Sequence, residues 1–206
     1  MITLRPASAA RRNNARQEQQ RLETRKALLA AAVEVFGARG YLDTSVEHVL
    51  ARANVSRAAF YRQFDSKLAL VCALASDFVP NWRPVFDSLM VLSAPSIDDL
   101  EQWARLHIAF HRDNQAICGL LTQVAGLEDR LYWQLADQRD ALITDLGQRF
   151  DTFRQAAEDP AMRLRARLLL AQIDETCFLI VRGRIPDPGH HAPRLIAEQI
   201  HALLQF

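Results

Sequence analysis

The strongest constraint on the fold is the spacing of apolar residues, which recur every three or four positions along nearly every long segment. Between residues 24 and 39, for instance, Leu29, Val33 and Phe36 fall on one face of a helix. No segment alternates apolar and polar residues as a half-buried strand does. Only seven glycines and eight prolines interrupt the chain. The pattern predicts an all-α fold.

Composition argues against several other classes of protein. The chain has 206 residues, half of them hydrophobic, which is enough to bury a substantial core. Its longest apolar-rich stretch, residues 164–181, is interrupted by charged side chains, so we expect no membrane span and no membrane partner. The basic N-terminus has no apolar segment behind it, so we expect no secretory signal. The three cysteines are widely spaced and form no CxxC motif, which favours a reducing, cytoplasmic location.

The formal net charge of +1 conceals an uneven distribution along the chain. Residues 1–67 contain twelve Lys or Arg against six Asp or Glu, whereas residues 68–206 contain thirteen against eighteen. A basic first third followed by an acidic remainder indicates a segment that binds a polyanion, attached to a body that does not.

Several residues mark where helices begin and end. Gly40 is expected in the left-handed conformation at the end of the first regular helix. Thr44, followed three residues later by Glu47, predicts a capping box at the start of the next helix. Asn54 tolerates positive φ and suits a tight turn, and Asp65 is expected to cap a helix that ends near residue 78.

The rest of the chain is also expected to be helical. Pro80, Pro84 and Pro95 are expected to interrupt the chain between two helices. Further helices are predicted over residues 96–112, 115–124, 160–182 and 193–205, and Gly126 is expected to precede a long helix that ends near residue 157.

The most informative segment is residues 44–67, TSVEHVLARANVSRAAFYRQFDSK. It contains two short capped helices joined by a turn of about three residues, which is the pattern of a helix-turn-helix motif. In that motif the second helix lies in the major groove of DNA. Small residues such as Ala58 fit there, because the helix backbone must approach the bases.

Residues 24–72 resemble the N-terminal domain of the TetR (tetracycline-repressor) family of bacterial transcriptional regulators. The resemblance rests on FGARGY at a helix end, T-x-x-E at a helix start, VSRAAFYRQF in the recognition segment and D-S-K-x-x-L at the next helix. One departure is Asn54, where the family usually has glycine. The resemblance implies an all-helical homodimer that binds a double-stranded DNA operator with its first domain and a small-molecule effector with its second.

We therefore predict three parts: a flexible basic arm over residues 1–20, a helix-turn-helix DNA-binding domain over 21–67, and a ligand-binding and dimerisation domain over 68–206. The last two predicted helices have apolar residues on more than one face. The resemblance implies that they pair with a second protomer as a four-helix bundle.

The candidate DNA contacts lie at the starts of the short helices and along the second of them. They are Ser45, Ser56, Arg57, Ala58, Tyr61, Arg62 and Lys67. Lys67 stands in the first turn of a helix, where the macrodipole disfavours a cation by about 0.3–1 kcal/mol. A bound phosphate would reverse that preference, and the resemblance gives Lys67 this role.

Each of these assignments has a structural alternative. Ser45 and Ser56 can serve as helix caps, and Tyr61 can be a core aromatic residue. The arginines of the arm can follow DNA phosphates or remain solvated. They are Arg11, Arg12, Arg16 and Arg21.

The candidate effector contacts are polar or aromatic residues on otherwise apolar helices. They are Trp103, His107, His111, Gln172, Glu175 and Thr176. His107 and His111 are four residues apart, a spacing that can bind a metal if Cys118 or Glu175 completes the site. Two histidines without a third ligand at fixed spacing are more often structural, so we predict no metal site and no cofactor.

No GxSxG, GxGxxG, P-loop or HExxH motif is present, so we predict that the protein is not an enzyme. The favoured function is a cytoplasmic, dimeric repressor that binds a palindromic operator and is released by a small organic ligand. One alternative is an activator, a co-repressed regulator or a metal-responsive regulator of the same fold. Another is a helical enzyme or a ligand-carrier protein.

Overall fold

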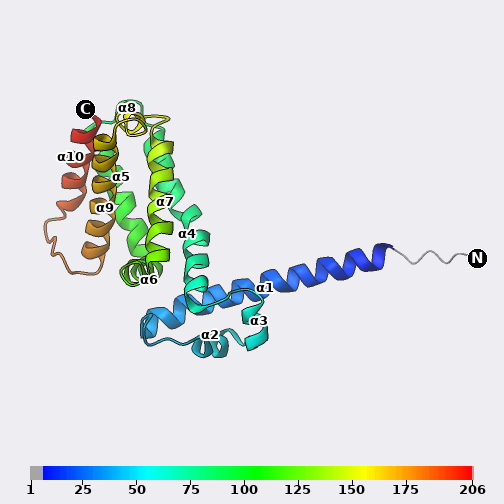
Figure 1. Ribbon diagram of the computed structural model, residues 1–206. Helices are drawn as coiled ribbons and strands as arrows, with labels where there is room; N and C mark the ends of the chain where they lie inside the picture. The colour runs from blue at the N-terminus through cyan, green and yellow to red at the C-terminus, as the bar shows by residue number, and fades with distance from the viewer. Residues whose placement is uncertain (1–6, 206) are drawn as a thin grey trace, which may run out of the picture. The chain divides into compact units, whose positions relative to one another are not determined.

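The computed structural model describes residues 7–205, with side chains described from residue 14 onward. Ten helices and no strand occur within this part of the chain, which confirms the all-α prediction (Figure 1). The chain divides into two compact units, Met1–Leu74 and Ala75–Phe206. The division falls inside a helix, whereas the sequence placed it at residues 67 and 68.

The first unit contains α1 (Ala7–Arg39), α2 (Val46–Ala53), α3 (Arg57–Tyr61) and the beginning of α4 (Lys67–Met90). Because α1 begins at Ala7, residues 7–20 are helical in the structure, where the sequence predicted a flexible arm. No glycine or proline occurs between residues 7 and 36, and Ala, Arg, Gln and Glu, all good helix formers, predominate. Residues 1–6 of the predicted arm lie outside the described residues, as do the side chains of Arg11 and Arg12.

The end of α1 follows the prediction. Gly40 has φ of 80° and donates its backbone N–H to the carbonyl of Phe36 at 2.8 Å, which closes the helix in the left-handed conformation. The predicted capping box at Thr44 is wrong by one residue, because Ser45 is the N-cap of α2. Thr44 is buried and its hydroxyl donates to the carbonyl of Gly40 at 2.7 Å. Its side chain thus serves the end of α1 instead of the start of α2.

The start of α4 shows a similar shift. The hydroxyl oxygen of Ser66 accepts a hydrogen bond from the backbone N–H of Ala69 at 3.0 Å, so Ser66 caps the helix in place of the predicted Asp65. Farther along, α4 continues through Pro80 and Pro84, which were expected to break it. Both prolines are exposed and four residues apart. Proline removes one backbone donor from the helix at each position, and the exposed side of the helix tolerates this loss best because water is at hand.

The second unit contains the rest of α4 and six further helices. They are α5 (Ile97–Asp113), α6 (Gln115–Ala125), α7 (Asp129–Leu146), α8 (Asp151–Gln155), α9 (Pro160–Val181) and α10 (Ala192–Leu204). In Figure 1, α5, α7, α9 and α10 run side by side, and α10 packs mainly along α5. Their common core includes Leu100, Leu146 and Ile173.

The single helix predicted over residues 126–157 is two helices, α7 and α8. At the break, a Cβ on Gly147 would lie 3.2 Å from the backbone of Arg154, a tight contact, so glycine favours the close approach of the two segments. None of the helices between residues 7 and 205 has both the length and the apolar character that crossing a bilayer requires.

Candidate nucleic-acid interface and ligand cavity

The turn between α2 and α3 has the geometry that the sequence predicted. Asn54 ends α2 with φ of 53° and ψ of 45°, in the left-handed region. Ser56 is the N-cap of α3, and its hydroxyl oxygen accepts a hydrogen bond from the backbone N–H of Ala59 at 3.2 Å. Asn54 therefore serves the turn as glycine would, and Ser56 has a capping role in the unbound protein.

One aromatic residue anchors α3 to the first unit. Phe60 is fully buried, with its ring centroid 5.7 Å from that of Phe64 and 5.2 Å from that of Tyr61. Since α3 has only five residues, burying Phe60 leaves most of its other side chains in solvent. Six of the seven candidate DNA contacts are exposed, and Tyr61 is 45% exposed. The exposed six are Ser45, Ser56, Arg57, Ala58, Tyr61 and Arg62.

The guanidinium of Arg57 lies between an acid and a ring. It is 3.0 Å from the carboxylate of Glu47 and 5.7 Å from the centroid of the Tyr61 ring. The pKa of Glu47 is lowered, and the largest cause is a hydrogen bond to its own backbone. A hydrogen bond to Ser45 and the charge of Arg57 lower this pKa further. Both members of the pair are more than half exposed, so its net contribution to stability is small. The pair is therefore weak enough for another anion to replace Glu47 beside Arg57.

Lys67 has a structural role that the sequence did not predict. Its ammonium donates to the carbonyls of Tyr41 and Thr44, each at 2.8 Å, and lies 4.1 Å from the centroid of the Tyr41 ring. These contacts attach the start of α4 to the loop between α1 and α2, and they explain why a cation is stable at a helix N-terminus. One ammonium proton remains for another acceptor, so the phosphate role of Lys67 stays a prediction.

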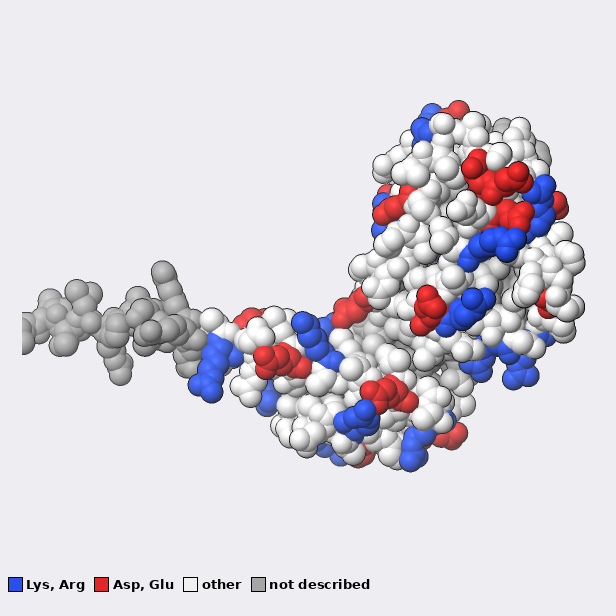
Figure 2. Space-filling model, turned by 180° about the vertical axis from the view of Figure 1, so that it is seen from behind, with Lys and Arg blue, Asp and Glu red and all other residues white. Residues whose placement is uncertain are grey.

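The basic excess of the first third of the sequence does not form a uniformly basic surface. Figure 2 shows acidic and basic side chains interspersed on the face in view. Several of the basic residues of the first unit have acidic partners, including the exposed pair Arg52 and Glu34.

The second unit contains a cavity of about 500 Å³, and all the residues that line it belong to that unit. Much of its wall is aromatic: Phe78, Trp82, Phe86, Phe110, Tyr132 and Phe178. Of the predicted effector contacts, His107, His111 and Glu175 line the cavity.

The other three candidates lie elsewhere. Trp103 is buried behind the wall, where it stacks on His107 and donates its indole N–H to the carbonyl of Val85 at 2.8 Å. Gln172 is exposed, Thr176 is half-buried, and neither lines the cavity. Both are helical neighbours of residues that do line it, and sequence spacing alone did not resolve which face of α9 is lined.

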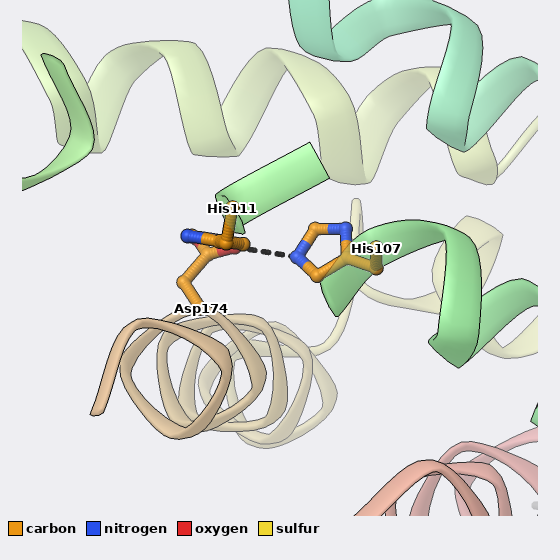
Figure 3. A group of neighbouring side chains, drawn as sticks. All are labelled: His107, His111 and Asp174. Carbon is orange, nitrogen blue, oxygen red and sulfur yellow. Dashed lines mark hydrogen bonds and ion pairs between the residues drawn. The ribbon is translucent and has the colours of Figure 1, made fainter. Parts of the chain in front are cut away.

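A polar cluster stands at one side of this cavity. His107 and His111 project from α5 towards Asp174 of α9 (Figure 3). Nε2 of His107 lies 3.1 Å from Oδ1 of Asp174, and Nε2 of His111 lies 3.8 Å from the same atom. On the other side of the carboxylate, the guanidinium of Arg139 lies 3.4 Å from Oδ2.

Asp174 was not among the residues predicted from the sequence, which included its neighbour Glu175. A signal was present, because Asp174 lies four residues after Leu170 and three before Cys177, both of which are buried. A carboxylate on the buried side of a helix requires partners, and His107 and Arg139 provide them.

The surroundings of the cavity shift the pKa of two groups that line it, Asp174 and Cys118. Burial by itself would raise the pKa of Asp174, but its interactions with His107 and His111 and the charge of Arg139 outweigh burial and lower it well below the usual range. The carboxylate is therefore ionised at neutral pH. Burial, together with the charge of Asp174, raises the pKa of the Cys118 thiol to about 12. Cys118 therefore remains a neutral thiol.

Comparison with known proteins identifies the first unit. Residues 28–74 match the family described as bacterial regulatory proteins, tetR family. Over 81 residues the chain is 32% identical to the uncharacterized HTH-type transcriptional regulator YdgC of Bacillus subtilis. The aligned segment covers 39% of this chain and 42% of YdgC. Over 77 residues the chain is 42% identical to the HTH-type transcriptional activator FasR of Mycolicibacterium smegmatis. This second alignment covers 37% of this chain and 34% of FasR. These matches thus cover less than half of either relative.

Solved structures resemble a larger part of the chain. A crystal structure titled as a putative TetR-family transcriptional regulator from Syntrophomonas wolfei matches 89% of this chain and 96% of its own, with a TM-score of 0.68 and 18% identity. Salmonella enterica GusR matches the same shares of the two chains, with a TM-score of 0.67 and 19% identity. At these identities the likeness concerns the fold, and it extends through both units.

Proposed function

The chain carries a TetR-family N-terminal domain and has the fold of TetR-type regulators, and from this we propose that it is a DNA-binding transcriptional regulator. In this proposal it acts in the cytoplasm as a homodimer on a palindromic operator and is a repressor released by a small organic ligand. The observation that carries the proposal is the family match over residues 28–74, which contain the left-handed turn at Asn54 and the exposed face of α3.

The proposed DNA contact places α3 in the major groove, which is about 12 Å wide and admits one helix. Ala58 allows the helix backbone to approach the bases, and Arg57 and Arg62 provide donors. Tyr61 packs against Phe60 and keeps nearly half of its surface exposed, so its hydroxyl is free to donate to a phosphate.

Exposed apolar side chains support the proposed dimer. Leu164 and Leu168 on α9 and Leu195 on α10 are all more than half exposed. Large apolar residues in solvent on two adjacent helices are typical of an interface, and a two-fold dimer would cover both copies of each.

The cavity is the proposed effector site. Its aromatic wall suits an apolar or aromatic molecule, and Asp174 and Glu175 favour a ligand that carries a hydrogen-bond donor or a positive charge. Ala75, Phe78, Trp82 and Phe86 of α4 line the cavity, and the same helix begins at Lys67 in the first unit. A ligand that favours one position of α4 would thereby alter the spacing of two recognition helices, which must match half-sites about 34–36 Å apart.

The test is selection of genomic DNA fragments by the full-length protein at moderate salt, followed by anisotropy titrations with the enriched site and a random duplex. We expect enrichment of a palindrome and clear preference for it over random DNA. Arg57→Ala should weaken specific binding by about 1–3 kcal/mol. Arg130→Ala, a change at an exposed arginine of α7, serves as the matched control and should leave binding unchanged. Failure to enrich any sequence would refute the proposal.

Activation is the second candidate for the direction of regulation, because FasR, with which the chain shares 42% identity over 77 residues, is named an activator. A reporter gene placed behind the enriched site separates the two. Repression predicts higher expression when the regulator is deleted, whereas activation predicts lower expression.

A further inference from the structure

We propose that His107, His111 and Asp174 form a binding site for a divalent transition-metal ion such as Zn²⁺ at the polar side of the cavity. The site would add a metal centre to the proposed effector pocket. The sequence had offered Cys118 or Glu175 as a third ligand beside the two histidines, whereas the tertiary structure brings Asp174 of α9 to them.

The spacing of the three side chains fits such an ion. One ligand atom from each residue lies within 4.8 Å of the others. Zinc bonds to imidazole nitrogen and carboxylate oxygen are about 2.0–2.2 Å long, so two ligands of a tetrahedral site stand roughly 3.3–3.6 Å apart. The observed separations of 3.1 Å and 3.8 Å between the imidazole Nε2 atoms and Oδ1 of Asp174 lie on either side of this range. These two contacts differ from the tetrahedral range by a few tenths of an ångström, and the ligand atoms of the two histidines lie within 4.8 Å of each other.

The surroundings hold the ligands in place. The His107 ring stacks on Trp103 with centroids 5.1 Å apart and meets Phe86 edge-on at 5.4 Å. Arg139 contacts Oδ2 of Asp174 and leaves Oδ1 directed at the two imidazoles. Metal-binding carboxylates are commonly oriented by a second partner in this way.

His111 faces the carboxylate of Asp174 without a hydrogen bond to it. Its side chain is 9% exposed, and its Nε2 lies too far from Asp174, at 3.8 Å, for a hydrogen bond. Its Nδ1, like that of His107, is buried without a hydrogen-bond partner among the described residues. A metal bond to Nε2 would give His111 a partner on the side that faces Asp174, and the two Nδ1 atoms would remain as they are.

The residue types indicate the class of ion. Imidazole suits Zn²⁺, Co²⁺, Ni²⁺ and Fe²⁺, and one ionised carboxylate between two imidazoles partly neutralises a dication. All three side chains line the cavity, so a fourth coordination position can open into it. Water or a donor atom of the effector could then complete the coordination.

The test uses the full-length, untagged protein and Co²⁺ as a spectroscopic probe. The exposed neighbours His190 and His191 are first replaced (His190→Asn, His191→Gln), because adjacent surface histidines can bind metal adventitiously. This control protein should bind one Co²⁺ per chain, with visible absorption bands of a four- or five-coordinate site and a higher melting temperature. Zn²⁺ should displace the Co²⁺ stoichiometrically.

Ligand variants make the assignment specific. His111→Gln and Asp174→Asn in the control background should each weaken binding by more than about a hundredfold, because loss of even an outer partner costs 10- to 100-fold. His111→Cys retains a metal ligand, and it should still bind Co²⁺ and add a sulfur-to-metal charge-transfer band. This third variant shows whether the site survives substitution in a folded protein, and circular dichroism in the presence of EDTA confirms folding of all three.

Two results would overturn the proposal: absence of saturable Co²⁺ binding in the control protein, or equal binding by the control protein, His111→Gln and Asp174→Asn. Neither result bears on DNA recognition, which is measured separately by operator titration in EDTA. Conversely, a protein that binds Co²⁺ at this site but selects no DNA would refute the proposed regulator and leave the metal site established.

Discussion

The lysine at the start of α4 is the sharpest test of how the first unit is held together. Lys67→Met keeps most of the aliphatic stem and removes the ammonium, which donates to the carbonyls of Tyr41 and Thr44 at 2.8 Å each. Hydrogen bonds from a charged donor contribute about 1.5–3 kcal/mol each. Because Lys67 is only half-buried, water can replace part of the contribution of these two hydrogen bonds. We therefore expect a loss of about 2–4 kcal/mol in local stability.

Native-state hydrogen exchange measures this loss where it occurs. Since about 1.4 kcal/mol corresponds to a tenfold change, the slowest amides of α2 and the end of α1 should exchange roughly 30- to 1,000-fold faster. Amides of α9 and α10 report on the second unit and should change little. Lys26→Met replaces the only other lysine, an exposed residue of α1, and should change exchange by less than about threefold. Unchanged exchange in α2 of Lys67→Met would refute the structural role.

The same variant tests the phosphate role of Lys67 under conditions in which it remains folded. Loss of one phosphate contact lowers the slope of log affinity against log salt by about 1. If the remaining ammonium proton reaches a phosphate, the slope for the selected operator should fall by this amount. An unchanged slope in a folded variant would leave Lys67 with its structural role alone.

Three further predictions concern the turn, the dimer and a surface ion pair. Asn54→Ala should destabilise the first unit by about 1 kcal/mol, because alanine resists φ of 53°, whereas Asn54→Gly should be close to neutral in chemical denaturation. Leu168→Glu should weaken self-association by more than about tenfold in sedimentation velocity. Leu127 is similarly exposed but lies outside α9 and α10, so Leu127→Glu should leave self-association unchanged. Equal effects of the two substitutions would argue against the proposed interface. Asp140→Asn should cost about 0.2–1 kcal/mol at pH 7, because a hydrogen bond from Arg167 lowers the pKa of Asp140 in the folded protein. That contribution to stability is present above the ordinary carboxyl pKa of 3.8 and is lost as the pH falls through the lower pKa of the folded protein. The stabilities of the wild-type protein and Asp140→Asn should therefore converge in acid. A difference in stability that persists in acid would contradict the assignment.

Features that depend on a few neighbouring residues could be predicted from the sequence. The left-handed ends at Gly40 and Asn54 follow from the conformational freedom of glycine and asparagine, and the structure confirms both. The errors at the starts of α2 and α4 are one residue in size, since Thr44 and Ser45, or Asp65 and Ser66, are equally able to cap. Local sequence does not decide which of two adjacent side chains caps the helix that follows and which forms a hydrogen bond with the helix that precedes it.

The sequence by itself therefore determined the helical class and the helix-turn-helix. Tertiary structure decided the use of polar groups that depend on partners distant in the chain. Lys67 meets carbonyls more than twenty residues away, and Asp174 meets an imidazole 67 residues away. Periodicity identifies the face of a helix, whereas the side chain that a buried charge meets depends on how the helices pack. That packing unites the two histidines of α5 with the carboxylate of α9, and the cluster could be recognised only once α5 and α9 were seen together.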